Sequence, residues 1–311
     1  MIQQLGLIGC GLMGGSFALA LRRAGWVRRV TGYSPSAHTL QRAQALGVID
    51  EAADSAGAAA AGSDLVLLAL PVGATGRALA AVREQLAPQA VVMDVGSTKG
   101  DVVAAAAQAL GDRLGQFVPA HPMAGREVSG VEHAQASLYD GCLVILTPLA
   151  DTRPQALDLA RSLWQALGCR VIDMPPQAHD AAVAAVSHLP HLLAFALMNG
   201  LDSQPGAAAS LAVAGPGFRD FSRIAASDPV MWRDILLANR QSVLAQSLSF
   251  RAALDRLEAT LQRGDGPALE ALIESARRLR TRWQAGQTGS LTPIGTHGPD
   301  GPGGPGATAA S

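Results

Sequence analysis

Short apolar runs alternate with amphipathic stretches through the first half of the chain. The apolar runs predict seven strands, at residues 5–9, 29–34, 65–70, 90–95, 117–120, 143–148 and 170–174. Between them, stretches such as 16–25 and 74–86 carry apolar residues at the spacing of a helix. Alternating strands and helices are typical of βαβ units. We therefore expect residues 1–176 to form an α/β domain with a doubly wound, mostly parallel sheet.

The pattern changes after Pro175 and Pro176. Residues 177–285 show long helical patterns and almost no β-branched alternation, which predicts an all-α C-terminal domain. Its most apolar stretch, 181–198, contains two histidines and a proline, and we interpret it as a buried helix rather than a membrane span. Residues 286–311 are dominated by Gly, Pro, Ser and Thr, a composition typical of a disordered tail.

The composition limits the class of protein. The chain has 311 residues, of which 49% are hydrophobic, enough for two domains with sizeable cores. A formal net charge of −1 gives no bulk electrostatic reason to bind nucleic acid or an anionic membrane. Three widely spaced cysteines indicate reduced thiols and a cytoplasmic protein. The N-terminus lacks the basic and apolar regions of a signal peptide.

A glycine-rich sequence joins the first predicted strand to the first predicted helix. Gly9, Gly11 and Gly14 follow the pattern G-x-G-x-x-G, and Leu12 and Met13 stand before the third glycine. The first glycine allows a tight turn, the second lets the backbone approach a pyrophosphate, and the third allows helix and strand to pack closely. The pattern therefore predicts a Rossmann-like dinucleotide-binding domain with these five residues at the cofactor.

The choice between NAD and NADP stays open. An NAD site usually has Asp or Glu at the end of the second strand, whereas this chain has Tyr33, Ser34 and Ser36 there. The missing acid removes a repulsion of the 2′-phosphate of NADP, and His38 and Arg42 add donors nearby. Ser34 could equally bind the ribose of NAD. We expect these three residues to contact whichever cofactor binds.

Candidate catalytic residues follow the strands predicted at 90–95 and 117–120, where ligands bind in such sheets. Ser97 and Lys99 follow the first strand, and His121 follows the second. A histidine suits the acceptance of a proton beside a carbon that gives up hydride, because its pKa lies near neutrality. Lys99 and Asp94 are interpreted either as a structural ion pair or as ligand contacts.

The helical half adds charged and aromatic candidates. Arg219, Arg223 and Arg233 lie in one short stretch and would suit an acidic substrate with two carboxylates. His188 and His191 are spaced i and i+3, but no third metal ligand is evident, so we predict no metal site. His188 is the better candidate for a packed core histidine.

Five motifs, in order along residues 5–285, make the chain similar to a known family. They are GxGLMGGS from Gly9, DxxSxK at 94–99, HPMAG at 121–125, SHLPH at 187–191 and GFRDFSRIAxxDPxMW at 217–232. Together they resemble prephenate dehydrogenases, the cyclohexadienyl dehydrogenase family of tyrosine biosynthesis. The resemblance covers both predicted domains but not the tail.

The resemblance implies NAD(P)-dependent oxidative decarboxylation of prephenate to 4-hydroxyphenylpyruvate. By that resemblance, His121 accepts the proton of the ring hydroxyl, and Ser97 hydrogen-bonds both the hydroxyl and the histidine. Arg223 matches the arginine that binds a substrate carboxylate. His191 and Trp232 match residues that line the substrate pocket.

One departure bears on the substrate. Several family members have a small hydroxyl residue after HPxAG, whereas this chain has Arg126 followed by Glu127. Arg126 could bind a substrate carboxylate or pair with Glu127. A further positive charge would disfavour the ammonium group of arogenate, the transaminated form of prephenate, so prephenate is the preferred interpretation. An arogenate-preferring cyclohexadienyl dehydrogenase is the alternative.

The resemblance further implies a homodimer through the C-terminal helices, at 232–262 and 268–283, although an intramolecular bundle would also cover them. Since no mutase segment precedes the first predicted strand and no folded regulatory domain would fit in the tail, we expect a monofunctional enzyme. The competing enzymes are related reductases with a helical dimer domain. Those that oxidise β-hydroxyacids use a lysine in that domain, and residues 177–285 contain none. Imine-reducing relatives would leave His121 and Arg223 without a role. A nucleotide sensor that has lost the chemistry is the non-enzymatic alternative.

Overall fold

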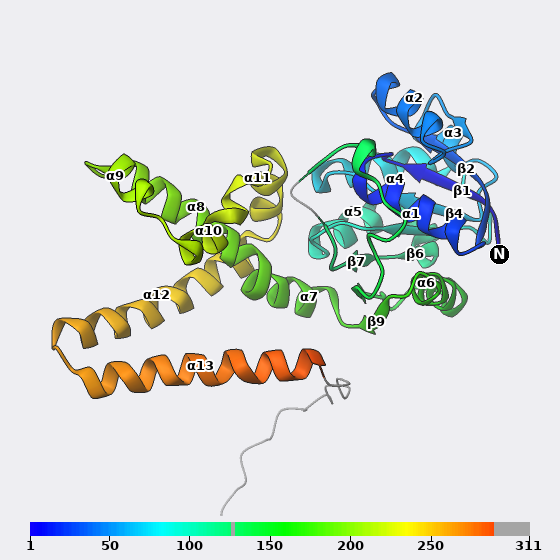
Figure 1. Ribbon diagram of the computed structural model, residues 1–311. Coiled ribbons are helices and arrows are strands. Elements are labelled where there is room, and N and C mark those ends of the chain that lie inside the picture. The colour runs from blue at the N-terminus through cyan, green and yellow to red at the C-terminus, as the bar shows by residue number, and fades with distance from the viewer. Residues whose placement is uncertain (126–127, 289–311) are drawn as a thin grey trace, which may run out of the picture. The chain divides into compact units, whose positions relative to one another are not determined.

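The computed structural model describes residues 1–125 and 128–288, and its first half is built on a six-stranded sheet (Figure 1). All five pairings in this sheet are parallel, in the order β3-β2-β1-β4-β5-β6. The strands are β1 (Ile2–Ile8), β2 (Val27–Tyr33), β3 (Glu51–Ala52), β4 (Leu65–Leu68), β5 (Val91–Asp94) and β6 (Phe117–Val118). The strand order reverses between β1 and β4, which is where a doubly wound sheet binds its ligand.

Two hydrophobic cores cover the two faces of this sheet, because successive side chains of a strand point to opposite faces. Leu65 and Leu67 of β4 belong to the core that includes side chains of α1 and α6. Val66 and Leu68 belong to the other core, with side chains of α3, α4 and α5. The helices are α1 (Leu12–Arg23), α2 (Ala37–Ala45), α3 (Ala56–Ala60), α4 (Thr75–Arg83), α5 (Gly100–Leu110) and α6 (Pro154–Ala166). The predicted doubly wound α/β domain is thus confirmed.

A second, three-stranded sheet corrects the prediction of a single strand at 117–120. Residues 117–118 form β6, whereas β7 (Ala120–Pro122) pairs antiparallel with β8 (Leu143–Leu146), which pairs in parallel with β9 (Arg170–Asp173). Pro119 separates the two strands, because it has no N–H to continue a ladder. His121 therefore lies within a strand of the second sheet, opposite Ile145, and not after the end of a strand.

The chain after β9 is helical, as predicted. Helix α7 (Pro176–Val183) passes through a π-helical turn (Ala184–His188) into α8 (Leu189–Asp202). Figure 1 shows α8 following α7 along the chain. The π turn ends two residues before Pro190, which cannot donate the regular helical hydrogen bond. The next elements are α9 (Ala207–Ala212), α10 (Pro216–Ser222), the 3₁₀ turn η5 (Arg223–Ala226) and α11 (Pro229–Ala238).

The apolar stretch 181–198 is less buried than the sequence predicts. It lies in Pro176–Asp202, the segment of the described chain that is long and apolar enough to cross a membrane by length and composition alone. Only 28% of its most apolar window is buried within the single chain, and Val186 is 72% exposed.

Two long helices complete the described chain, α12 (Arg240–Gln262) and α13 (Gly266–Thr288). The chain divides into two compact units between Leu248 and Ser249, within α12, and every residue of the site described below belongs to the first unit. Because α13 continues to Thr288, residues 286–288 are helical and not part of the predicted tail. The rest of that predicted tail, 289–311, lies outside the described residues.

Candidate active site

The glycine loop between β1 and α1 has the geometry of a phosphate cradle. Gly9 has φ +102°, and a Cβ there would lie 2.2 Å from the carbonyl oxygen of Ala69. A Cβ on Gly14 would lie 2.1 Å from the carbonyl oxygen of Gly9. A Cβ on Gly11 would meet no atom within 4 Å. Two glycines are thus required by packing, and the third borders open space at the N-terminus of α1, where a pyrophosphate fits.

Neighbouring contacts hold this loop against the sheet. The backbone N–H of Gly9 donates to the carbonyl of Tyr33 at 2.9 Å. In the first turn of α1, Leu12 is buried and the Met13 carbonyl accepts a hydrogen bond from the Tyr139 hydroxyl at 2.8 Å. These contacts fix the backbone of the predicted cofactor residues. Their contact with a cofactor remains a prediction.

Substitutions at Gly11 and Gly14 separate cofactor binding from folding. We expect Gly14→Ala to lower the free energy of unfolding by about 1–3 kcal/mol, because its Cβ would clash with backbone. Gly11→Ala is expected to leave the Tm unchanged and to weaken cofactor binding about tenfold or more, because its methyl group would occupy the phosphate space. Thermal unfolding without cofactor and fluorescence titration with NAD measure the two effects. Equal behaviour of the two variants would contradict this assignment.

The end of β2 leaves the cofactor preference open. The Ser34 hydroxyl accepts a hydrogen bond from the backbone N–H of Ser36 at 3.3 Å. Ser36 is the N-cap of α2 and accepts from the N–H of Thr39 at 3.2 Å. Arg42 lies 3.5 Å from a carboxylate oxygen of Glu132, so its charge is already partly compensated. Both serines therefore have local structural roles besides their predicted role toward the cofactor.

His121 belongs to a buried chain of polar side chains. It is 8% exposed, and its Nδ1 lies 2.7 Å from Nε2 of His179, a completely buried residue of α7. Nδ1 of His179 lies 2.8 Å from a carboxylate oxygen of Asp180. That carboxylate also accepts the backbone N–H groups of Lys99 at 2.9 Å and of Gly100 at 2.8 Å. The helical segment thus contacts the predicted base directly.

Burial sets the charge state of this histidine. Desolvation lowers the pKa of His121 well below its ordinary value, and the neighbouring His179 and Lys99 lower it further. The side chain is therefore neutral at physiological pH, as a general base must be before it accepts a proton. Although burial opposes its ionisation, hydrogen bonds from His179, Gly100 and Lys99 hold the pKa of Asp180 below its usual value. Asp180 is consequently a carboxylate.

Asp94 joins the two loops that carry the predicted catalytic residues. It forms an ion pair with Lys99, and both side chains are almost completely buried. Its carboxylate accepts the N–H of Gly96 at 2.8 Å and that of Ala120 at 3.2 Å. These are the residues immediately before Ser97 and His121. Of the two interpretations of this pair, the structure shows the structural one.

Ser97 is half-buried in the loop between β5 and α5. Within residues 1–125 and 128–288, no hydrogen bond joins Ser97 to His121. The two residues are brought to the same edge of the fold by Asp94, whereas the contact that the resemblance implies remains a prediction for the substrate-bound enzyme.

The predicted pocket residues of the helical segment lie together. The rings of His191 on α8 and Trp232 on α11 stack at 3.5 Å between centroids, with 20° between their planes. Nδ1 of His191 lies 2.9 Å from the carbonyl oxygen of Ser187, which cannot donate, so His191 donates this hydrogen bond. Its Nε2 is thereby left as the acceptor atom of the neutral ring.

A buried asparagine connects this aromatic cluster to the base. The amide of Asn239 donates to the backbone carbonyl of Asp180 at 2.8 Å and lies 3.2 Å from Nδ1 of His188. His188 in turn lies edge-on to Trp232, and burial lowers the pKa of His188 to about 4. The interpretation of His188 as a packed, hydrogen-bonded core residue agrees with these contacts.

Of the two predicted carboxylate-binding arginines, Arg223 lies within the described residues and Arg126 does not. Arg223 is exposed and begins the turn η5, which packs against α8, the helix of His191. Arg126 and the neighbouring Glu127 lie outside the described residues. In the described chain, no group of three or more His, Cys, Asp or Glu residues is arranged to hold a metal ion.

Sequence reasoning missed His179, Asp180 and Asn239. Two adjacent titratable residues in the otherwise apolar stretch AHDAAV, at the start of a predicted buried helix, were the available signal for His179 and Asp180. Buried titratable groups need partners, so their position alone raises the question of what they contact. Asn239 lies between α11 and α12, and no feature of its neighbours in the sequence distinguishes it.

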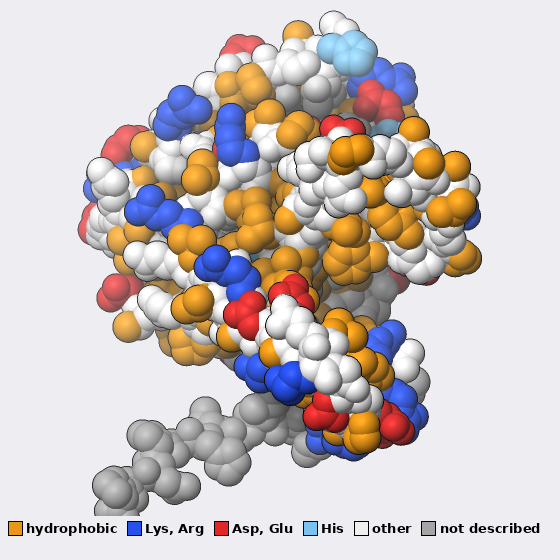
Figure 2. Space-filling view, turned by 90° about the vertical axis from the view of Figure 1, so that its left-hand side faces the viewer, with side chains coloured by type: hydrophobic (Ala, Val, Ile, Leu, Met, Phe, Trp, Pro, Cys, Tyr) orange, Lys and Arg blue, Asp and Glu red, His pale blue; other side chains and the backbone are white. Residues whose placement is uncertain are grey.

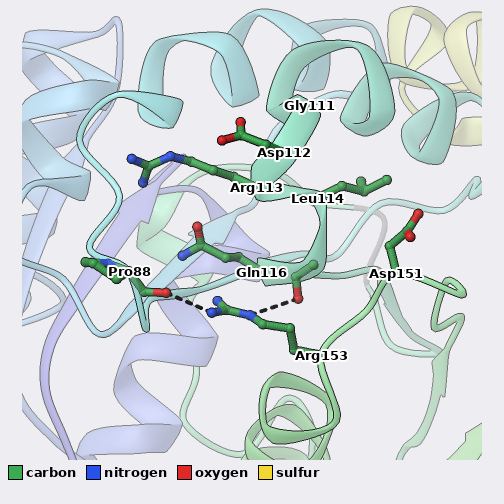
Figure 3. A pocket seen from close by; sticks show the side chains of 9 residues that line it. Pro88, Gly111, Asp112, Arg113, Leu114, Gln116, Asp151 and Arg153 are labelled. Atoms are coloured by element: carbon green, nitrogen blue, oxygen red, sulfur yellow. Dashed lines mark hydrogen bonds between the residues drawn. The ribbon is translucent and has the colours of Figure 1, made fainter.

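A concave region lies at the edge of the sheet opposite the glycine loop. Figure 3 shows a pocket lined by residues that precede β5 and β6, together with Asp151 and Arg153. Arg153 donates to the carbonyls of Pro88 at 2.8 Å and Gly115 at 3.4 Å. The guanidinium of Arg153 is thus already hydrogen-bonded to backbone carbonyls. Ligands of doubly wound sheets bind at the carboxyl ends of the strands, whereas this pocket lies at their amino ends, so it is not the candidate site.

The sequence matches two family models in tandem. "Prephenate dehydrogenase, nucleotide-binding domain" matches residues 17–173, and "Prephenate dehydrogenase, dimerization domain" matches residues 175–275. The chain belongs to the prephenate dehydrogenase family. It is an oxidoreductase whose N-terminal domain is the nucleotide-binding domain of that family.

Individual relatives agree over nearly the whole chain. Prephenate dehydrogenase of Bacillus subtilis is 34% identical over 291 residues, covering 92% of this chain and 77% of the relative. Cyclohexadienyl dehydrogenase of Zymomonas mobilis is 34% identical, covering 89% of this chain and 95% of the relative. A solved structure of prephenate dehydrogenase from A. aeolicus, in complex with hydroxyphenyl propionate and NAD+, has a TM-score of 0.83 and 36% identity, covering 92% of this chain and 98% of that one.

Proposed function

We propose that this protein catalyses the oxidative decarboxylation of prephenate to 4-hydroxyphenylpyruvate with NAD or NADP. The observation that carries the proposal is His121, a buried neutral base at the edge of a dinucleotide-binding fold. The A. aeolicus relative supports the substrate class, since its ligand hydroxyphenyl propionate is chemically close to 4-hydroxyphenylpyruvate.

The reaction needs a base and a hydride acceptor at one carbon. A bound dinucleotide at the glycine loop would supply the hydride acceptor for the ring carbon that carries the hydroxyl. His121 accepts the hydroxyl proton, while Ser97 holds the hydroxyl in line. Loss of the ring carboxylate as CO2 then places its electron pair in the ring and gives an aromatic phenolate. His121 returns the proton to the phenolate oxygen, so that the base is neutral again after each turnover.

The carboxylates of the substrate require cationic or donor groups at the other end of the pocket. We propose that Arg223 binds one of the two substrate carboxylates, on the ring or on the side chain. His191 and Trp232 would line the walls of the substrate pocket. Their stacking supports this assignment, because it holds the two rings together across α8 and α11. Arg126, five positions after His121 in the sequence, would add a second guanidinium and favour the keto acid prephenate over the ammonium-bearing arogenate.

The same proposal extends to a cytoplasmic homodimer. The helical region carries large apolar side chains that are exposed in the single chain, and Figure 2 shows hydrophobic side chains on its surface. They include Leu237, Leu244, Leu248, Leu254, Leu261, Ile273 and Leu279. Contact with a second copy of the chain would bury these side chains and explain why they are apolar. The match to a family dimerization domain supports a homodimer.

Initial rates with both substrates and both cofactors test the function. Purified protein is mixed with prephenate or arogenate and with NAD or NADP, and the formation of reduced cofactor is followed at 340 nm. We expect the largest kcat/KM with prephenate. A larger value with arogenate would establish the alternative, an arogenate-preferring cyclohexadienyl dehydrogenase, which the Zymomonas mobilis relative keeps open. No turnover in any of the four mixtures would refute the proposed reaction.

A further inference from the structure

The buried chain of His121, His179 and Asp180 defines where the protons lie. A carboxylate can only accept hydrogen bonds, so Nδ1 of His179, 2.8 Å from Asp180, must carry a proton. In the neutral ring of His179, Nε2 is then a bare acceptor. This atom lies 2.7 Å from Nδ1 of His121, so Nδ1 of His121 must be the donor. The remaining ring nitrogen of His121, Nε2, therefore bears the lone pair.

We propose that Asp180 and His179 are positioning residues that fix His121 in the tautomer whose Nε2 is the catalytic base. The proposal rests on the proposed function, since it explains how that base is prepared. Through His179, the carboxylate of Asp180 also stabilises the positive charge that His121 acquires when it accepts the proton. The two residues come from α7, so the start of the helical segment completes a site whose base lies in the second sheet.

Hydrogen bonds from three other residues fix the position of Asp180 itself. Its carboxylate accepts the N–H groups of Lys99 and Gly100, where α5 begins just after Ser97. Its backbone carbonyl accepts the amide of Asn239. One carboxylate thus ties the Ser97 loop to the orientation of His121. A misplaced Asp180 would disturb both partners that the reaction needs in line.

The charged groups around His121 all belong to this assembly. Besides His179 and Asp180, they are Lys99 with its partner Asp94 and the more distant His188. Lys99 and His188 disfavour the protonated ring of His121, and Asp180 is the carboxylate that reaches it through hydrogen bonds. Removal of the charge of Asp180 is therefore expected to make protonation of His121 harder.

Asp180→Asn tests the proposal, because it removes the charge of Asp180 with little change of size. The oxygen beside His179 also accepts the N–H of Lys99, and the other oxygen accepts that of Gly100, so an amide NH2 meets a backbone donor in either position. With the NH2 toward His179, both histidines reverse their tautomers; with the oxygen there, the charge of His121 still loses its stabilisation. We expect kcat to fall at least about tenfold, and up to about 10⁴-fold where the wrong tautomer prevails. The KM for prephenate and the Kd for NAD are expected to stay within about threefold. The acid limb of the pH profile of kcat/KM should move to lower pH.

His188→Gln is the matched control, since His188 is equally buried and shares Asn239 but makes no hydrogen bond to His121 in the described chain. We expect it to lower the Tm while changing kcat by less than about threefold. Because His188 disfavours protonation of His121, any movement of the acid limb should be to higher pH, opposite to that of Asp180→Asn. If Asp180 had a purely structural role, both variants would lose kcat in proportion to their loss of Tm. That result, or an unchanged kcat in Asp180→Asn, would overturn the proposal.

The tautomer can also be read without activity. Nitrogen-15 NMR of the full-length wild-type protein is expected to show His121 with Nδ1 protonated and Nε2 bare. The opposite tautomer would overturn the proposal even if Asp180→Asn does not fold. Absence of turnover by the wild type would refute the proposed function alone, because the NMR spectrum decides the tautomer independently.

Discussion

His121→Asn is expected to lower kcat with prephenate about 10³- to 10⁴-fold, the largest loss of activity that we predict. Asparagine can still donate to Nε2 of His179, so the buried hydrogen-bonded chain persists in the folded protein. What the variant lacks is a group that can accept the hydroxyl proton, and general bases contribute rate factors of up to about 10⁴. Stopped-flow and steady-state rates at pH 7.5 measure the effect.

The cofactor provides the internal control for this variant. The dinucleotide loop begins at Gly9 on the parallel sheet, so the Kd for NAD is expected to remain within about twofold of the wild type. His133→Asn serves as the external control, because His133 is an exposed histidine in a surface turn. It should leave kcat unchanged. A loss of less than tenfold for His121→Asn would show that another group acts as the base.

Lys99→Met is expected to produce the largest loss of stability, about 3–5 kcal/mol in the free energy of unfolding. Lys99 is completely buried, and its ion pair with Asp94 is shielded from water. Removal of the ammonium group leaves a carboxylate buried next to an apolar side chain. Urea unfolding followed by circular dichroism gives the free energy for comparison with the wild type.

The double variant Asp94→Asn with Lys99→Met separates the charge from the packing. Replacement of a buried ion pair by neutral groups of similar size costs less than removal of one partner. The double variant should therefore be more stable than Lys99→Met alone, although it loses part of the hydrogen bonding to Gly96 and Ala120. A double variant less stable than Lys99→Met would mean that the hydrogen bonds of Asp94, and not its charge, dominate.

The parts of the fold that rest on local patterns were predictable from the sequence. Buried runs such as Leu65–Leu68 and Val91–Asp94 contain only residues that favour a covered parallel strand, apart from Asp94 at the end. In contrast, β3 consists of Glu51 and Ala52 alone, which carry no periodic signal. The strand of His121 was misplaced, because its partner β8 is remote in the sequence and Pro119 conceals the change of sheet.

The candidate site shows the same division between local and remote information. The glycine loop and the strand-end position of Ser97 follow from local motifs. The contact of His121 with His179 spans 58 positions, and that of Asn239 with Asp180 spans 59. A single sequence carries no record of which distant polar residues meet. A buried polar side chain needs a hydrogen-bond partner, but only the fold determines which residue that partner is.

The stoichiometry of the reaction tests the central claim most directly. In one progress curve, the purified protein is supplied with prephenate and the preferred cofactor, and reduced cofactor, CO2 and 4-hydroxyphenylpyruvate are all quantified. We predict equal amounts of the three products, because hydride transfer and loss of the ring carboxylate belong to one reaction at one site. Reduced cofactor without CO2, or no reduced cofactor at all, would contradict oxidative decarboxylation by this protein.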